Sequence, residues 1–86
     1  MQINYAKNFQ KAFLKLDKKR REKVLEAIQF FQVDPFDPIL RNHPLKGSMQ
    51  GKRSFSVTGD IRIIFEEYES YTLVLMLDVG THNQVY

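Results

Sequence analysis

Few side chains in this 86-residue chain could carry out chemistry. It has two histidines, His43 and His82, and Asp60 and Arg62 flank a single residue. Imidazole accepts and donates protons near neutral pH, and guanidinium stabilises the charge on a phosphorane. This set suits metal-free cleavage of RNA, in which a 2′-hydroxyl attacks the adjacent phosphate and the 5′-oxygen leaves. Asp60 and Arg62 would share one face of a strand, and incidental surface histidines together with a cross-strand ion pair on a solvated sheet face would account for the same residues.

Metal and nucleotide cofactors are not expected. The chain has no cysteine, and its histidines do not form an H-x-x-x-H pair, so it offers no spacing for the three or four ligands of a zinc site. The glycine-containing segment 47–51 is not a phosphate-binding loop of the Walker or Rossmann type. We therefore predict no metal and no cofactor.

Length and composition predict one soluble domain, residues 1–86. A chain of 10.2 kDa with 43% hydrophobic and 27% charged residues is ordinary for a small globular protein, and too small for a multi-domain enzyme. It has neither an apolar run of about 18 residues, as a membrane span requires, nor the pattern of a signal peptide. We expect no membrane partner and a cytoplasmic location.

Positive charge is concentrated in the first part of the chain. Residues 1–30 hold eight basic and three acidic residues, a net +5, whereas residues 63–86 hold four acids and no Lys or Arg. This asymmetry favours contact with a polyanion through one surface, although a solvated helix face explains it equally well. The basic candidates are Lys11, Lys15, Lys18, Lys19, Arg20 and Arg21.

Two amphipathic helices are predicted at the N-terminal end. Phe9, Phe13 and Leu16 have the spacing of one helical face. Asp17 resembles the N-cap of a second helix, in which Lys18 and Glu22 are spaced for an ion pair. Because so few residues join the helices, we expect an antiparallel hairpin.

A sheet is predicted in the second half. Residues 35–51 carry prolines and glycines and suggest a loop. Strands are expected at 52–57, at 60–66 with Ile61, Ile63 and Phe65 on one face, and at 71–79, a central strand that Gly80 ends. Residues 81–86 suggest a final short strand. The fold class is α+β: a two-helix hairpin on one face of a three- to four-stranded, mainly antiparallel sheet, with the other face free for function.

Three segments resemble the RelE/ParE superfamily of bacterial type II toxins, and most closely its YafQ-like branch. They are His-Pro-Leu-Lys-Gly-Ser-Met-Gln-Gly-Lys-Arg at 43–53, Gly-Asp-Ile-Arg-Ile-Ile-Phe at 59–65 and Gly-Thr-His-Asn-Gln-Val-Tyr at 80–86. The resemblance covers nearly the whole chain and implies a RelE-like fold. It also implies a ribosome-dependent mRNA endonuclease that is held inactive by a cognate antitoxin.

The resemblance also implies roles for individual residues. His43, Asp60 and His82 match catalytic positions, with His82 the general acid, and Arg62 lies where many relatives place a phosphate-stabilising arginine. Further matches lie along the RNA path: Lys46, Lys52, Arg53 and Tyr86. The basic helices would bind ribosomal RNA without sequence selectivity. Ser56 and Ile61 depart from the branch, which has histidine and tryptophan there.

Other functions stay open at this stage. A ParE-type toxin that inhibits gyrase shares the fold and cuts no RNA, and a non-catalytic RNA-binding module would not need the histidines. The partners implied are an antitoxin, the ribosome and mRNA. The oligomeric state is open, and a heterotetramer with the antitoxin is one such assembly.

Overall fold

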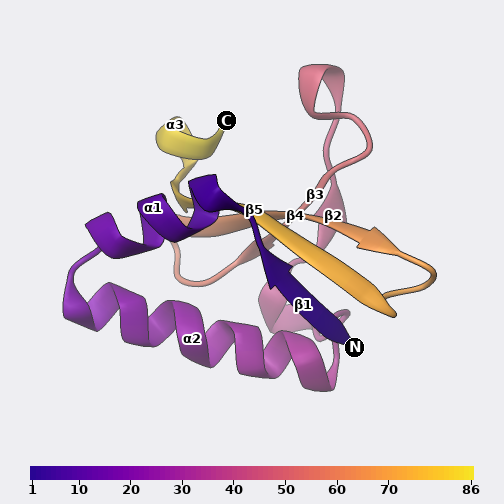
Figure 1. The fold of residues 1–86 in the computed structure, drawn as a ribbon, viewed down its shortest axis with the longest axis horizontal. Coiled ribbons are helices and arrows are strands. Elements are labelled where there is room, and N and C mark those ends of the chain that lie inside the picture. Colours follow the sequence, from indigo (N-terminus) through magenta and orange to yellow (C-terminus); the bar gives the residue numbers. More distant parts are fainter.

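The computed structural model describes residues 1–86 as two helices packed on a five-stranded sheet, with a short third helix (Figure 1). The strands are β1 (Gln2–Tyr5), β2 (His43–Pro44), β3 (Arg53–Ser56), β4 (Ile61–Tyr68) and β5 (Leu73–Thr81), in the spatial order β1-β5-β4-β3-β2. Only β1 runs parallel to its neighbour. The predicted α+β class and mainly antiparallel sheet are confirmed, with one more strand than the upper estimate.

The strand that the sequence analysis missed is β1. It lies at the edge of the sheet and pairs with β5, which places Ile3 beside Val74. Of its four residues only Ile3 is partly buried, so the strand lacks the alternation that marks a half-buried strand. Because of β1, β5 is an interior strand, as its two apolar faces predicted.

The predicted helical hairpin is confirmed. Helix α1 spans Lys7–Lys15 and α2 spans Lys18–Val33. The Asp17 carboxylate accepts a hydrogen bond from the Arg20 N–H at 2.8 Å and caps α2. It also forms an ion pair with the Arg20 guanidinium at 3.2 Å, whereas the expected pair between Lys18 and Glu22 does not form. That prediction was wrong: the ion pair at the start of α2 joins the N-cap Asp17 to Arg20, and Lys18 and Glu22 are both exposed.

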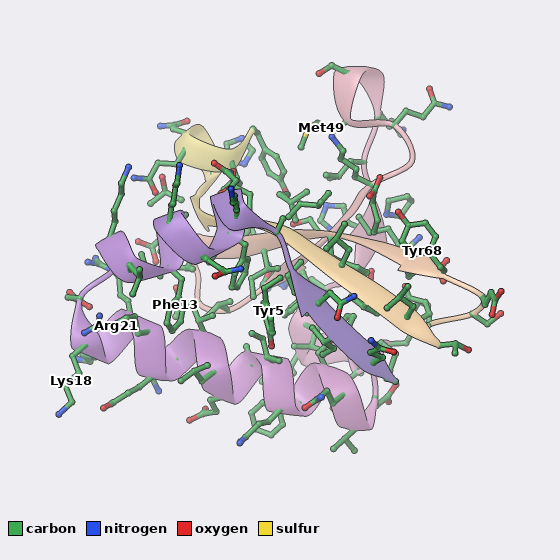
Figure 2. All side chains as sticks on the ribbon, viewed as in Figure 1. Tyr5, Phe13, Lys18, Arg21, Met49 and Tyr68 are labelled. Carbon is green, nitrogen blue, oxygen red and sulfur yellow. The ribbon has the colours of Figure 1, made fainter.

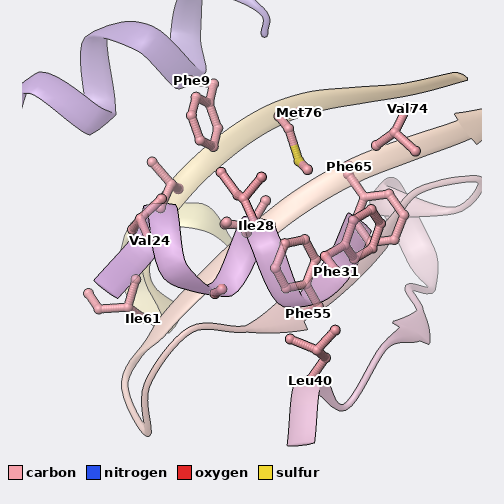
Figure 3. Close-up of a cluster of buried hydrophobic side chains, with 13 residues drawn as sticks. Phe9, Val24, Ile28, Phe31, Leu40, Phe55, Ile61, Phe65, Val74 and Met76 are labelled. Carbon is pink, nitrogen blue, oxygen red and sulfur yellow. The ribbon is translucent and has the colours of Figure 1, made fainter. Parts of the chain in front are cut away.

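One face of the sheet packs against the two long helices and forms the core (Figure 3). Phe31 of α2 stacks on Phe55 with ring centroids 4.5 Å apart and meets the edge of Phe65 at 5.0 Å. Ile61, Ile63 and Phe65 lie in this core, as their alternation predicted. The core residues are Phe9, Val24, Ala27, Ile28, Phe31, Leu40, Phe55, Ile61, Ile63, Phe65, Val74, Met76 and Val79.

The C-terminal segment is a helix, α3 (His82–Val85), and not the strand that was predicted. Thr81 and Gln84 form a capping box that starts it. Nor does Gly80 end β5, which continues to Thr81. A Cβ on Gly80 would lie 2.7 Å from Oε1 of Gln84 and 3.4 Å from Val85. The absence of a side chain at Gly80 therefore lets α3 fold back over the strand.

Residues 35–51, predicted as a loop, contain three short ordered pieces. They are the 3-10 helix Pro38–Leu40, the strand β2, and a second 3-10 helix Gly47–Met49. Strand β2 pairs His43 with Ser54 and Pro44 with Arg53. The second 3-10 helix lies on a loop that projects beyond the sheet (Figure 1). The prediction failed at β2, because two exposed residues carry no periodicity.

The predicted strand boundaries are otherwise off by only one or two residues. Strand β3 is shorter than 52–57, β4 begins at Ile61 and extends to Tyr68, and β5 begins at Leu73. Helices α2 and α3 lie on opposite sides of the sheet (Figure 1). The face away from α2 is thus only partly covered, by α3. This agrees with the prediction that part of this face is free for function.

Candidate active site

Ser54 lies at the centre of the candidate site. It is fully buried, the only polar residue that is, and its neighbour Phe55 points into the helix-covered core. Successive side chains of a strand alternate between faces, so Ser54 lies on the face away from α2. His43 stands directly opposite Ser54 in the antiparallel pair β2–β3, which places both side chains on one face.

Tyr86 connects α3 to the same serine. Its hydroxyl donates a hydrogen bond to Ser54 Oγ at 2.7 Å, although the two residues are 32 positions apart. Its ring meets the imidazole of His82 edge to face, with centroids 4.5 Å apart. Both His82 and Tyr86 keep exposed surface. Tyr86 thus connects His82 to Ser54, the residue that stands opposite His43.

The imidazole of His43 is oriented by the backbone. Its Nδ1 lies 2.7 Å from the carbonyl oxygen of Arg41. A carbonyl oxygen can only accept a hydrogen bond, so this contact places the proton on Nδ1. In the neutral ring, Nε2 then carries the lone pair and is available to accept a proton.

Arg62 lies on the same face, toward the β3–β4 turn. It pairs with Ser56 across β3 and with Gly80 across β5, and its guanidinium donates to Ser56 Oγ at 2.6 Å. Asp78 stands opposite Ile64 on this face, and its carboxylate accepts the N–H of Val79. A half-buried arginine held by a hydroxyl suits a phosphate oxygen, since little of its freedom is left to lose.

Asp60 is not on the strand where it was expected. It lies in the turn before β4, where its carboxylate accepts a hydrogen bond from the Thr58 hydroxyl at 2.8 Å. The expected sharing of one strand face by Asp60 and Arg62 is thus wrong, because the strand begins at Ile61. Ile61 itself is buried in the core, not at the site.

The predicted RNA-binding cations are divided between regions. Lys46 is exposed on the projecting loop, and Lys52 precedes β3. Arg53 shares strand parity with Phe55, donates to Asn42 at 2.9 Å and lies over the ring of Phe36 at 5.8 Å. The structure therefore turns Arg53 away from the histidines.

The basic helical residues are in a separate layer. Lys18 and Arg21 mark the start of α2, whereas Met49 marks the projecting loop on the other side of the molecule (Figure 2). Arg21 is half-buried, and Arg20 is tied to Asp17. The exposed lysines are Lys11, Lys15, Lys18 and Lys19. The helices that carry these residues pack on the core face of the sheet.

Sequence reasoning missed two residues of this region, Ser54 and Arg41. Ser54 had one available signal, a small polar residue between Arg53 and Phe55 in a strand. No sequence signal indicated the contact between the Arg41 carbonyl and His43. That contact depends on the backbone of Arg41, which lies in the left-handed region with φ 52°. In this chain no three His, Cys, Asp or Glu side chains are grouped to hold a metal ion.

The clear pKa shifts lie outside the site. Burial raises the pKa of Tyr5, and a hydrogen bond to the Glu66 carboxylate raises the pKa of Tyr68.

None of the helices has the length and apolar character that a membrane span requires.

The fold is shared with bacterial type II toxins. A family model described as "Bacterial toxin of type II toxin-antitoxin system, YafQ" matches residues 1–86, and the chain belongs to that family. A search of curated proteins gave no match.

Solved structures agree with this assignment. YafQ from E. coli strain BL21(DE3) is 25% identical, with a TM-score of 0.77 over 99% of this chain and 97% of that chain. The E. coli DinJ-YafQ toxin-antitoxin complex gives 26% identity and a TM-score of 0.77, covering 99% and 96%. A YoeB/ParE toxin from Agrobacterium tumefaciens is 21% identical with a TM-score of 0.77, covering 95% and 99%, and shares the fold.

Proposed function

We propose that this toxin is a ribosome-dependent mRNA endonuclease that cleaves RNA by metal-free acid–base catalysis. One observation carries the proposal: His43 and His82 lie on the same face of the sheet, joined through Ser54 and Tyr86. Two exposed imidazoles at one place supply both a proton acceptor and a proton donor, which cleavage at a phosphodiester requires.

The proposed reaction assigns each proton. Nε2 of His43 accepts the proton of the 2′-hydroxyl, and the 2′-oxygen forms a bond to the adjacent phosphorus. The bond from phosphorus to the 5′-oxygen breaks, and the protonated imidazole of His82 gives its proton to that oxygen. The products are a 2′,3′-cyclic phosphate and a 5′-hydroxyl. The Arg41 carbonyl supports His43 as the base, because it holds the proton on Nδ1. Asp60 would act at the edge of the site, with its carboxylate oriented by Thr58.

Cations would stabilise the charge that develops. Arg62 would contact the reacting phosphate from the same face, and Lys46 and Lys52 would line the approach of the RNA. Tyr86 would hold His82 in place. Arg53 would act indirectly, through Asn42, since it points to the opposite face.

The basic helices would dock on the ribosome. Lys11, Lys15, Lys18 and Lys19 are exposed and free of carboxylate partners, since the only ion pair in the chain is Arg20–Asp17. Such lysines give affinity for RNA that falls as salt rises. Arg20 and Arg21 would contribute less, one because it is paired and the other because it is half-buried.

A cognate antitoxin would be the second partner. YafQ of E. coli forms a toxin-antitoxin complex with DinJ, and a family member is expected to be neutralised in the same way. The toxin would act in the cytoplasm, where translated mRNA is found.

The test is His82→Ala, compared with Asn83→Ala as a matched control. Asn83 is the next residue of α3 and is exposed, so its loss should leave the fold and the site unchanged. We expect His82→Ala to abolish growth arrest and the cleavage of translated mRNA, read by primer extension, while Asn83→Ala retains both. Circular dichroism should show both variants folded.

Full toxicity of His82→Ala would refute the assignment. Growth arrest accompanied by altered DNA supercoiling, without new mRNA ends, would favour the ParE-type alternative. Loss of cleavage in both variants would show that α3 matters only for folding.

A further inference from the structure

A second group of cations lies beyond the histidines, at the turn between β3 and β4. A small cavity of about 210 Å³ opens there, lined by Ile39, Arg41, Ser56, Val57, Thr58, Gly59 and Arg62. It is smaller than the pockets of about 300–1,000 Å³ that hold drug-sized ligands, so it suits a single compact group. Two arginines and no acidic residue line it, so the group that it suits is an anion.

Both arginines are free of acidic partners. The one ion pair in the chain, Arg20–Asp17, lies at the start of α2. The carboxylate of Asp60, two residues before Arg62, is held by the Thr58 hydroxyl and lies within 4.0 Å of neither arginine. Arg62 is half-buried and uses one of its five N–H groups on Ser56, which leaves donors for a ligand. Arg62 is half-buried and Arg41 is exposed, and the uncompensated positive charge of these two lining residues favours the binding of an anion.

Arg41 connects this cavity to the histidine. It ends the 3-10 helix Pro38–Leu40 in the left-handed region, with φ 52°, and its N–H donates to Pro38 O at 3.3 Å. In this conformation its carbonyl accepts the hydrogen bond from His43, and the same residue lines the cavity. One residue therefore orients the proposed base and supplies a cation to the second site.

We propose that this cavity is an anion site for a backbone phosphate of the RNA that flanks the cleaved one, formed by Arg41 together with those N–H groups of Arg62 that contact neither Ser56 nor the cleaved phosphate. Ser56 is two residues along β3 from Ser54, about 7 Å away, so a group in this cavity is distinct from the one between the histidines. The inference rests on the proposed function, because it names RNA as the source of the phosphate. Arg41 is a positioning residue here. By holding the flanking phosphate, it would place the RNA so that the cleaved phosphate lies at His43 and His82.

The test measures binding, not cleavage. The probe is a short single-stranded RNA carrying 2′-O-methyl groups, which the toxin cannot cut. Its affinity is measured by fluorescence anisotropy over a series of salt concentrations for wild type, Arg41→Ala, Arg41→Lys and the control Lys23→Ala. Lys23 is an exposed cation of α2 outside the cavity.

Loss of one phosphate contact should reduce the slope of log K against log salt by about 0.7 for a single strand. We expect this smaller slope in Arg41→Ala. The slopes of Arg41→Lys and Lys23→Ala should equal that of the wild type. In a second measurement, inorganic phosphate should move the Nε–Hε NMR signals of Arg41 and Arg62 but not that of Arg20.

Each contrary result overturns the proposal. An unchanged slope in Arg41→Ala shows that no RNA phosphate binds there, even if free phosphate moves the two NMR signals. An equal reduction of the slope in Arg41→Ala and Lys23→Ala would show only a general effect of positive charge. Because the RNA is not cleaved, these results do not depend on His82. Failure of the His82→Ala test would refute the endonuclease and leave the anion site standing.

Discussion

The hydrogen bond from Tyr86 to Ser54 should hold α3 against the sheet, and a double-mutant cycle can measure its energy. Ser54 is fully buried, and the Tyr86 hydroxyl is its only side-chain partner, at 2.7 Å, the most common length for an O–H···O bond. Tyr86→Phe keeps the ring against His82 and removes only the hydroxyl. It should leave a buried hydroxyl unpaired, at a cost of about 1–3 kcal/mol in the free energy of unfolding.

Ser54→Ala should cost less than Tyr86→Phe. Tyr86 is an exposed residue whose hydroxyl should then bond to water, so the loss should be about 0.5–1.5 kcal/mol, the net value of one hydrogen bond. In the double variant neither group is left unpaired. The two losses should therefore not add, and the coupling energy should be about 1 kcal/mol.

Urea unfolding of the four proteins, with a constant m-value, gives these numbers. In a domain of this size, a loss of 1 kcal/mol would lower Tm by about 4–8 °C. Tyr68→Phe is the control: its hydroxyl donates to Glu66 at 2.9 Å on the exposed surface, and its removal should change stability little. Additive losses at Ser54 and Tyr86, or a loss at Tyr68 as large as that at Tyr86, would refute the reasoning.

Three further changes test other parts of the fold. Asp17→Ala removes the cap of α2 and should lower the free energy of unfolding by about 1 kcal/mol, whereas Asp17→Asn should keep most of it, both measured in urea. Gly80→Ala places a Cβ 2.7 Å from Oε1 of Gln84, which is held in the capping box, and should speed amide hydrogen exchange in α3 without affecting the core. Because burial raises the pKa of Tyr5, its contribution to stability should be complete below about pH 10 and be lost as the pH rises further; Tyr5→Phe should remove that loss in pH-dependent unfolding.

The core could be predicted from the sequence because its pattern is local. Ile61, Ile63 and Phe65 occupy every second position of the strand, and each strand position fixes the face of the next. Asp17 was identified as an N-cap for the same reason, since a cap acts within its own first turn. These local patterns can be recognised without knowing which segments of the chain contact each other.

The elements that were missed depend on contacts between distant residues. Strand β1 exists because β5 offers it an edge, and nothing in Gln2–Tyr5 alone indicates that pairing. The strand predicted at 81–86 is a helix because the Thr81–Gln84 capping box starts it and Gly80 leaves room for it. Both outcomes follow from the tertiary structure overriding weak local preferences.

The candidate site shows the same division. The residue types predict the proposed chemistry, because a cysteine-free chain with two histidines has few side chains that transfer protons near neutral pH. Their grouping came from Ser54, which no spacing in the sequence connects to Tyr86. The orientation of His43 came from the backbone of Arg41.

Placing the site on the face away from the long helices has a physical consequence. Phe31, Phe55 and Phe65 stack within the core on the other face, so the strands that carry Ser54 and Arg62 are held rigid from behind. In contrast, His82 is carried by a four-residue helix, which is too short to be stable alone and depends on the Tyr86–Ser54 bond and the capping box. The proposed base and the phosphate-binding arginine are thus fixed by the sheet, while the proposed acid is the most easily displaced. Contacts on the ribosome that press α3 against β5 would complete the site, so a toxin of this kind could remain inactive on free RNA without any inhibitor.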